Sequence, residues 1–268
     1  MDKNRRIPER IVVVGAGGNG SWLSFFLAQY MSYDPRFSDT ELVIVDHDRF
    51  EEKNKSRQFF SRPGNKAESL VGTLKMRFGD RIKLVAEPRM VVDERVELNQ
   101  DIEDNLGVFL IYPWELISVN SVVFLCVDKF YPRLAILQRA SMTYRVCVIN
   151  GGTGPFDWGV DIYIREKGRD VTRRPDIVHP ELVGLANAEL AEMLNQFNQP
   201  QTEGCTQRME TDAAGQTFVS NLSTATLMFQ TFVAYLEGQL TVSSYEGGIM
   251  TKQGGLVGPG LRMILPGS

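Results

Sequence analysis

A glycine-rich run at residues 15–20, Gly-Ala-Gly-Gly-Asn-Gly, lies between a short apolar segment and a longer segment with helical spacing. Backbone N–H groups at the start of a helix attract an anion, and glycines allow a phosphate to approach the main chain closely. The candidate contacts are Gly15, Gly17, Gly18 and Gly20. The motif predicts a nucleotide but not its kind, since dinucleotide oxidoreductases carry it as well. The alternative is a tight strand-to-helix turn that binds no ligand.

Charged and amide side chains follow a second apolar segment, which ends at Asp46. A carboxylate at this place accepts hydrogen bonds from ribose hydroxyls, in NAD and in ATP alike. The polar residues that follow include Asp48, Asn54, Arg57, Gln58 and Lys66. A hydride-transfer enzyme does not need so many cations and amides here, whereas a triphosphate must be neutralised before a carboxylate can attack it. The pattern therefore favours a triphosphate site over a solvated charged loop.

Asp128 and Cys205 are two further candidates, and each has a structural alternative. Asp128 follows another apolar segment, where a carboxylate also serves as the cap of the next helix. Cys205 lies in a polar stretch beside a glycine, which predicts a loop in which the thiol is either reactive or simply a small residue. Cys126 and Cys147 lie within apolar segments and are predicted to be core residues.

These residues must be positioned by alternating strands and helices. Apolar and alternating runs predict strands at residues 11–14, 42–45, 82–85, 122–127, 146–149, 160–164 and 261–265. Helical spacing predicts helices at residues 21–30, 66–78, 133–144, 180–195 and 217–238, and a glycine-rich turn is expected at residues 151–154. Because the first strands are apolar throughout, we expect a parallel sheet with helices on both faces. Later strands alternate, and we expect them to be antiparallel.

Composition narrows the function classes. The chain has 268 residues and a formal net charge of -4, with acids and bases interspersed, which argues against a nucleic-acid-binding or polybasic membrane surface. No apolar run approaches the length of a membrane span, so we expect a cytoplasmic protein. Three cysteines without CxxC spacing do not predict a disulfide framework or a zinc site. His47 and His179 are interpreted as surface or hydrogen-bonded residues.

The motifs resemble those of the ThiF/MoeB/HesA family of ubiquitin-activating-enzyme-like adenylating proteins, and within it a short plasmid- and phage-associated subgroup. Residues 15–20 match the family's GxGGxG. Its DxDxVExxNLxRQ is matched by Asp46, Asp48, Glu51, Asn54, Arg57 and Gln58, with Phe50 for Val and Lys55 for Leu. Residues 64–67 match the family's GxxKA with one residue fewer. The family also has an acid-asparagine pair followed by an arginine; Asp128 and Arg133 match the acid and the arginine here, and Lys129 replaces the asparagine.

The resemblance implies roles for these residues. Arg57 and Lys66 would bind the phosphates, and Asn54 would orient one of them. Asp128 would hold Mg²⁺ against the phosphate oxygens, and Asp48 would support the adenosine side. ATP and Mg²⁺ are thus the implied cofactors.

The resemblance also implies a fold and an activity. The expected fold is a Rossmann-like α/β structure with a doubly wound, mostly parallel sheet extended by antiparallel strands. One adenylation domain over residues 1–268 would contain a nucleotide-binding half (1–165), a crossing segment (166–216) and a C-terminal helix and strands (217–268). The chain would work as a homodimer and join AMP to the C-terminal glycine carboxylate of a small protein or peptide.

Several alternatives remain open at this point. After adenylation, Cys205 would accept the acyl group as a thioester or persulfide, or the second step would be sulfur transfer or amide formation. A catalytically weak nucleotide-binding partner subunit is a second possibility, favoured by Lys129 in place of asparagine. An NAD- or FAD-dependent oxidoreductase is a third, favoured only by the glycine run.

Overall fold

The computed structural model describes residues 7–51, 58–59, 63–96, 109–153, 157–197, 217–240, 244–248 and 262–264. A parallel sheet forms its centre, with the strands in the order β7-β6-β1-β2-β3. These strands are β1 (Arg10–Val14), β2 (Glu41–Val45), β3 (Lys83–Glu87), β6 (Ser121–Leu125) and β7 (Val146–Thr153). The central ones are buried on both faces, as their apolar, β-branched sequences predict.

Antiparallel strands extend the sheet beyond β7. They are β8 (Asp157–Glu166), β9 (Arg169–Asp170), β10 (Ser244–Gly248) and β11 (Arg262–Ile264). The predicted turn at residues 151–154 was wrong in its first part, because Gly151, Gly152 and Thr153 continue β7 and pair with β8. Cross-strand hydrogen bonding to an antiparallel neighbour fixes these residues as strand even though glycine favours turns.

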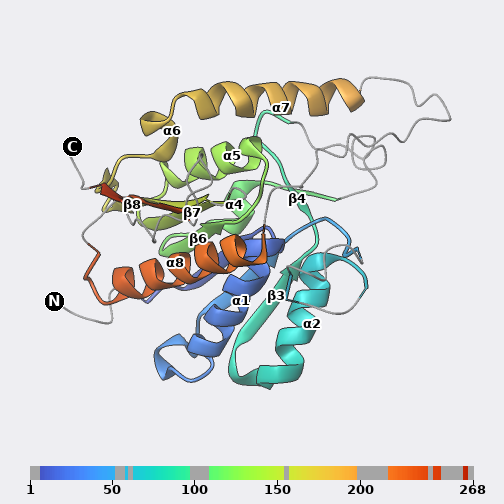
Figure 1. The fold of residues 1–268 in the computed structure, drawn as a ribbon, viewed down its shortest axis with the longest axis vertical. Coiled ribbons are helices and arrows are strands. Elements are labelled where there is room, and N and C mark those ends of the chain that lie inside the picture. The colour runs from blue at the N-terminus through green and yellow to red at the C-terminus, as the bar shows by residue number, and fades with distance from the viewer. Residues whose placement is uncertain are drawn as a thin grey trace.

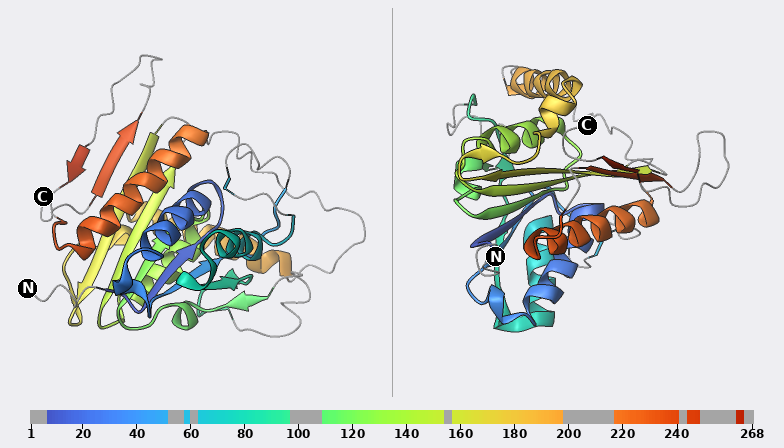
Figure 2. Two further views of the ribbon diagram at one scale, coloured as in Figure 1. Left: turned by 90° about the horizontal axis from the view of Figure 1, so that it is seen from below. Right: turned by 90° about the vertical axis from the view of Figure 1, so that its left-hand side faces the viewer.

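Helices cover both faces of the sheet, which confirms the doubly wound α/β prediction (Figures 1 and 2). One face carries α1 (Gly18–Met31), α2 (Lys66–Phe78) and α8 (Phe218–Leu236). The other carries α4 (Pro113–Leu116), α5 (Phe130–Ala140), α6 (Pro175–Val178) and α7 (Glu181–Phe197). Two 3₁₀ turns, Pro35–Phe37 and Gly79–Arg81, and a small parallel pair, β4 (Met90–Val91) with β5 (Leu110–Ile111), complete the described elements.

Helix and strand boundaries differ from the predictions mainly where the cavity lies. The helix predicted at 66–78 is α2, with the predicted bounds. The helix predicted at 21–30 begins earlier, at Gly18, and the one predicted at 133–144 begins at Phe130 and ends at Ala140. The strand predicted at 122–127 ends at Leu125, so Cys126 lies just beyond it and Asp128 is three residues past its end.

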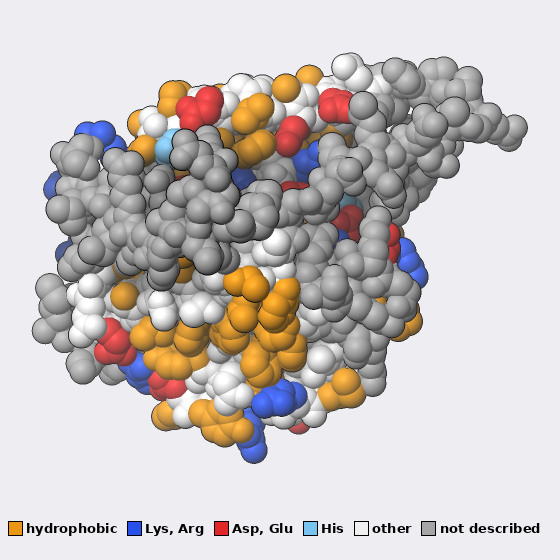
Figure 3. Space-filling view, viewed as in Figure 1, with side chains coloured by type: hydrophobic (Ala, Val, Ile, Leu, Met, Phe, Trp, Pro, Cys, Tyr) orange, Lys and Arg blue, Asp and Glu red, His pale blue; other side chains and the backbone are white. Residues whose placement is uncertain are grey.

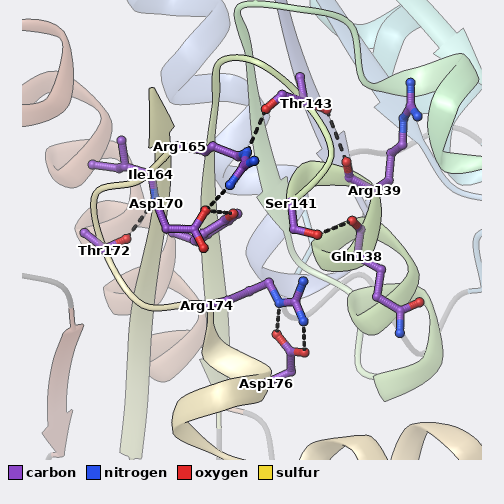
Figure 4. A network of polar contacts seen from close by, with 11 residues as sticks. Gln138, Arg139, Ser141, Thr143, Ile164, Arg165, Asp170, Thr172, Arg174 and Asp176 are labelled. Carbon is purple, nitrogen blue, oxygen red and sulfur yellow. Dashed lines mark hydrogen bonds and ion pairs between the residues drawn. The ribbon is translucent and has the colours of Figure 1, made fainter. Parts of the chain in front are cut away.

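A polar network at the outer end of β8 connects β8 and β9 to the loop after α5 and to α6 (Figure 4). Asp170 accepts a hydrogen bond from the Tyr163 hydroxyl at 2.7 Å and pairs with Arg165, whose Nε donates to the Thr143 carbonyl at 3.0 Å. Next to it, Arg174 pairs with Asp176 at the start of α6. His179, the residue that follows α6, lines the cavity described below.

Hydrophobic side chains gather on the surface over α8, α1 and α2 (Figure 3). Phe218 packs edge-on against Trp22, with ring centroids 5.6 Å apart, and is 43% exposed.

In the part of the chain that the structure describes, no helix combines the length and the apolar character needed to cross a lipid bilayer.

Candidate functional site

A cavity of about 510 Å³ lies at the carboxyl ends of β1, β2, β6 and β7. This is the edge at which ligands bind in open α/β sheets, because the strand order reverses there and leaves a crevice. Its walls include the glycine run after β1, the residues after β2 and β6, the start of α2, and parts of β7, β8 and α7. We refer to it as the central cavity.

The N-terminus of α1 opens into the central cavity without a side-chain cap. Gly17 is the N-cap residue, and no acid occupies the first turn of the helix. Nothing lies within 4 Å of the place where a Gly17 Cβ would stand, so the space above the backbone is free in the described structure. The first N–H groups of a helix have no intrahelical acceptor, and they favour an anion here.

Two other glycines make this turn possible. Gly15 has a φ of +97°, a conformation that L side chains rarely adopt. A Cβ on Gly20 would lie 1.8 Å from the Gly15 carbonyl oxygen. The run therefore contains glycines of two kinds: Gly15 and Gly20 allow the chain to fold, while Gly17 leaves space for a ligand.

Asp46 holds the glycine turn against the end of β2. Its Oδ2 accepts a hydrogen bond from the Ala16 N–H at 2.7 Å, and its Oδ1 accepts one from the Asp48 N–H at 2.8 Å. Burial raises the pKa of Asp46 above its usual value, although the nearby Lys66 ammonium and these two N–H donors oppose the shift. Lone pairs on the carboxylate remain for a ribose hydroxyl, so this predicted role stays a prediction.

Lys66 is placed at the cavity by its neighbour Asn65. The Asn65 side chain caps α2 by accepting from the Glu68 N–H at 3.1 Å, and its Nδ2 donates to the Asp46 carbonyl at 2.8 Å. Lys66 is then the first residue of α2, and its Nζ lies 2.8 Å from Asp48 Oδ2. Desolvation alone would lower the Lys66 pKa, but the surrounding carboxylates outweigh it and raise the pKa overall. The ammonium therefore stays charged.

Asp128 carries a carboxylate without a hydrogen bond or ion pair to any described residue, and it lines the central cavity. The alternative prediction, a cap on the following helix, is wrong: Lys129 is the N-cap residue of α5, and the carboxylate bonded to the first N–H groups belongs to Glu189. An exposed carboxylate facing a nucleotide cavity suits Mg²⁺, which binds through one or two carboxylates plus phosphate oxygens and water.

A second group of possible metal ligands lies on the opposite wall. Ligand atoms of Asp46, His47 and Asp48 lie within 4.8 Å of one another. Asp48 is already paired with Lys66, and both Asp46 oxygens hold backbone N–H groups. Among the described residues, Asp128 is thus the carboxylate that fits a metal with the least rearrangement.

The wall formed by β7 and β8 has a different chemistry, which the sequence alone did not reveal. Gly152 pairs with Gly159 across the two strands, and nothing stands within 4 Å of a Gly152 Cβ position. Next to them, Asn150 donates to Asp161 at 3.3 Å. Arg133 of α5 donates to the Asn150 side chain and to the Gly151 carbonyl, and burial lowers the pKa of its guanidinium.

Asn19 connects the glycine turn to this second wall. Its Nδ2 donates to Thr153 Oγ1 at 2.6 Å, and Thr153 exchanges a hydrogen bond with Thr224 of α8 at 3.0 Å. The Asn19 Oδ1 atom is buried and has no hydrogen-bond partner among the described residues. A buried acceptor of this kind is costly unless a ligand or water satisfies it.

Some predicted residues lie outside the described part of the chain, and others lie in unexpected places. Asn54, Arg57 and Cys205 are not among the described residues. Gln58 is described, is buried and lines the cavity. His47 and His179 are partly exposed and lie beside the carboxylates of Asp48 and Glu181, in agreement with their interpretation as surface or hydrogen-bonded residues. Both also line the cavity, which no sequence signal indicated for two histidines so far apart.

Cys126 also differs from its prediction. It lies on the cavity wall just beyond β6 and not inside the strand. Burial raises the pKa of its thiol to about 12, and a thiol that stays protonated is a poor nucleophile. Cys147 lies in β7 and is fully buried, as predicted.

Comparison with solved structures shows the same fold. Escherichia coli MccB with AMPCPP and the peptide MccA aligns with a TM-score of 0.57 and 14% identity, over 98% of this chain and 66% of that one. PaaA aligns with a TM-score of 0.59 and 16% identity, again over 98% and 66%. Escherichia coli MccB with ATP gives 0.55 and 16%, over 98% and 65%. The chain thus spans just under two thirds of the length of these structures.

A family model provides the classification. No curated protein sequence matches the chain. The model of the ThiF family matches residues 3–170, which is more than half of the chain and contains the glycine run, Asp46, Lys66 and Asp128. The chain belongs to the ThiF family.

Proposed function

We propose that this protein uses ATP to adenylate a C-terminal carboxylate of a protein or peptide. One observation carries the proposal: an uncapped helix N-terminus, a charged lysine and an unpaired carboxylate face the same cavity of about 510 Å³. Together these groups suit a metal-bound triphosphate, whose charge they would neutralise with the metal ion, whereas a hydride-transfer enzyme does not need them. Family membership and the fold shared with MccB, which has been solved with ATP and with the peptide MccA, support the proposal.

The reaction asks for little covalent chemistry from the chain. A carboxylate oxygen of the substrate attacks the α-phosphorus of ATP, the bond from that phosphorus to the bridging oxygen breaks, and pyrophosphate leaves with the electron pair. The carboxylate is already ionised at neutral pH, so no general base is required. Positioning and charge neutralisation are therefore the tasks of the site.

Each wall of the cavity then has a task. The α1 N–H groups bind phosphate oxygens, Lys66 neutralises the negative charge that grows on the phosphates, and Asp46 binds ribose. Asp128 would hold Mg²⁺, which would supply positive charge to neutralise the phosphates. The glycine pair on β7 and β8 leaves room for the C-terminal residues of the substrate beside the phosphates.

ATP–pyrophosphate exchange in the presence of candidate carboxylate substrates tests the proposal. A glycine-terminated small protein, a glycine-terminated peptide and a peptide with another C-terminal residue are compared. Lys66→Ala and Asp128→Ala should each lower exchange by roughly 10³-fold, since cationic groups at a phosphoryl transition state contribute on this scale. Lys75→Ala, at the exposed far end of α2, is the matched control and should exchange like the wild type.

Two results would contradict an adenylating enzyme. Tight ATP binding without exchange for any carboxylate would identify a nucleotide-binding partner subunit. Preferential binding of NAD(H) over ATP would identify an oxidoreductase.

We further propose two properties that the family resemblance implies. The chain would form a homodimer, which light scattering checks directly. Cys205 would accept the activated acyl group; a thiol-sensitive adduct that is lost in Cys205→Ser checks this step. Cys205 would act only after adenylation, so ATP–pyrophosphate exchange should not depend on it.

A further inference from the structure

The helix that follows Asp128 has no local means of satisfying its first N–H groups. Its N-cap residue, Lys129, makes no side-chain cap, and its first turn contains no acid. Four N–H groups at the start of any helix lack intrahelical acceptors, and burying them without partners is unfavourable. The turn at residues 128–131 therefore depends on a partner from elsewhere in the chain.

Glu189 of α7 is that partner. Its Oε2 accepts hydrogen bonds from the Phe130 N–H at 2.6 Å and from the Tyr131 N–H at 3.0 Å. A carboxylate at a helix N-terminus is favoured by its charge as well as by these bonds. Glu189 is separated from both residues by more than fifty positions, so only the folded chain brings them together.

Apolar packing fixes Glu189 in this position. Ala186 and Leu190 of α7 are buried in one cluster with Tyr131 and Leu134 of α5. Residues three and four apart lie on the same face of a helix, so Glu189 faces α5 together with these two. The crossing segment is thereby joined to the residues that directly follow Asp128.

The same contact also distinguishes α5 from α1 and α2, which begin at the cavity wall as well; α7 begins there too, with Glu181 as an acid in its first turn. The N-terminus of α2 is capped by Asn65, and that of α5 is occupied by Glu189. The N-terminus of α1 has neither a side-chain cap nor an acid in its first turn. Of these three positively polarised sites, α1 is the one left open to an anionic ligand.

We propose that Glu189 is a positioning residue with two effects on the site. It fixes the turn that carries Asp128, and by orienting Asp128 it raises the affinity of the nucleotide site for Mg²⁺. The first effect belongs to the folded chain itself. The second rests on the proposed function, because it requires that the ligand be a metal-bound triphosphate.

Amide hydrogen exchange of the ligand-free protein tests the first effect. Glu189→Ala should exchange the Phe130 and Tyr131 amides roughly tenfold faster than the wild type, because two N–H groups lose their acceptor. Glu189→Gln keeps an oxygen acceptor without the charge and should stay within about threefold of the wild type. Glu192→Ala, at an exposed glutamate about one turn further along α7, is the matched control. If Glu189→Ala exchanges no faster at these amides than Glu192→Ala, the proposal is overturned.

The Mg²⁺ concentration that half-saturates ATP binding tests the second effect. Loss of a group that orients a metal ligand commonly weakens metal binding by tenfold or more, so Glu189→Ala should need about tenfold more Mg²⁺. Glu189→Gln should recover most of this loss, which a general loss of stability would not allow. An unchanged Mg²⁺ requirement in Glu189→Ala would overturn the second effect. Failure of the wild type to bind ATP would instead refute the proposed function, and hydrogen exchange would still decide the first effect.

Discussion

The two walls of the central cavity are built in different ways. The wall at β1 and β2 is charged, and its main residues come from one stretch, 15–66, in which Asp46, Asn65 and Lys66 are each held by a neighbour in that stretch. The wall at β7 and β8 presents two glycines, Gly152 and Gly159, beside the hydrogen-bonded pair of Asn150 and Asp161. Arg133 of α5 binds the Asn150 side chain, so this wall also depends on a helix outside the two strands. The charged wall suits a ligand of fixed chemistry, and the open wall suits one whose size and sequence differ.

This difference agrees with the proposed function. Phosphates need cations and N–H donors at set distances, which a local motif can provide because its geometry depends on one turn and one helix start. A peptide end needs room and a few polar contacts, which two paired glycines on a sheet provide. We therefore expect mutations at the two walls to separate nucleotide binding from use of the carboxylate substrate.

Among the variants that test the difference between the walls, Gly152→Val, which puts a side chain into the open wall, should have the largest effect. No atom of the described residues lies within 4 Å of the Cβ position, so the first carbon of the new side chain meets no described neighbour. Exchange with the carboxylate substrate should fall by roughly 10²-fold, because a small displacement of a reacting group has effects of this size. ATP binding, measured by calorimetry, should remain close to that of the wild type.

Gly72→Ala is the control for this substitution. It also adds a side chain at a glycine with free space, but on α2 and away from the cavity lining. If Gly152→Val lowered ATP affinity by the same factor as it lowered the ATP–pyrophosphate exchange rate, the two walls would not be functionally separate.

Gly17→Ala and Gly20→Ala test whether two glycines of the charged wall have separate roles, one in ligand binding and one in folding. The Gly20 substitution forces a Cβ against the Gly15 carbonyl and should lower the free energy of unfolding by about 1–3 kcal/mol. Gly17→Ala meets no atom and should leave stability nearly unchanged while weakening ATP binding, because its methyl group occupies the phosphate space. Thermal unfolding and ATP titration of both variants measure the difference; equal stability losses would show that the two glycines do not have separate roles.

The smallest effect is expected at the outer end of β8, far from either wall. Desolvation alone would raise the Asp170 pKa, but the Tyr163 hydroxyl and the Arg165 guanidinium outweigh it, so the pKa is lowered in the folded state. This contribution to stability is therefore present above the unfolded-state pKa near ~3.9 and disappears as the pH falls through the lower folded-state value.

Asp170→Asn should remove this contribution. The Asp170 side chain is 44% exposed, so the loss at neutral pH should be under about 1 kcal/mol. Urea unfolding of the variant and the wild type from pH 7 downward should give curves that converge in acid. A constant difference at all pH values would show that the charge of Asp170 is not responsible.

The sequence by itself determined the α/β class, the bounds of α2 and the placement of the glycine run, Asp46 and Lys66 at one cavity. These features are local: buried strands are apolar throughout, helices start after capping residues, and a glycine turn between strand and helix has few conformations. For the same reason Asp128 was correctly placed near the end of a strand, although the strand ends two residues earlier than predicted.

Only the tertiary structure decided which groups meet across the sheet. Gly151 and Gly152 would suit a turn on their own, and pairing with β8 makes them strand. Glu189 belongs to no motif, yet the packing of α7 against α5 brings it to the Phe130 and Tyr131 N–H groups beside the cavity, and His179, between α6 and α7, lines the cavity itself. Such contacts depend on how separate elements pack, and that packing is set by apolar surfaces that carry no signal about the polar residues between them.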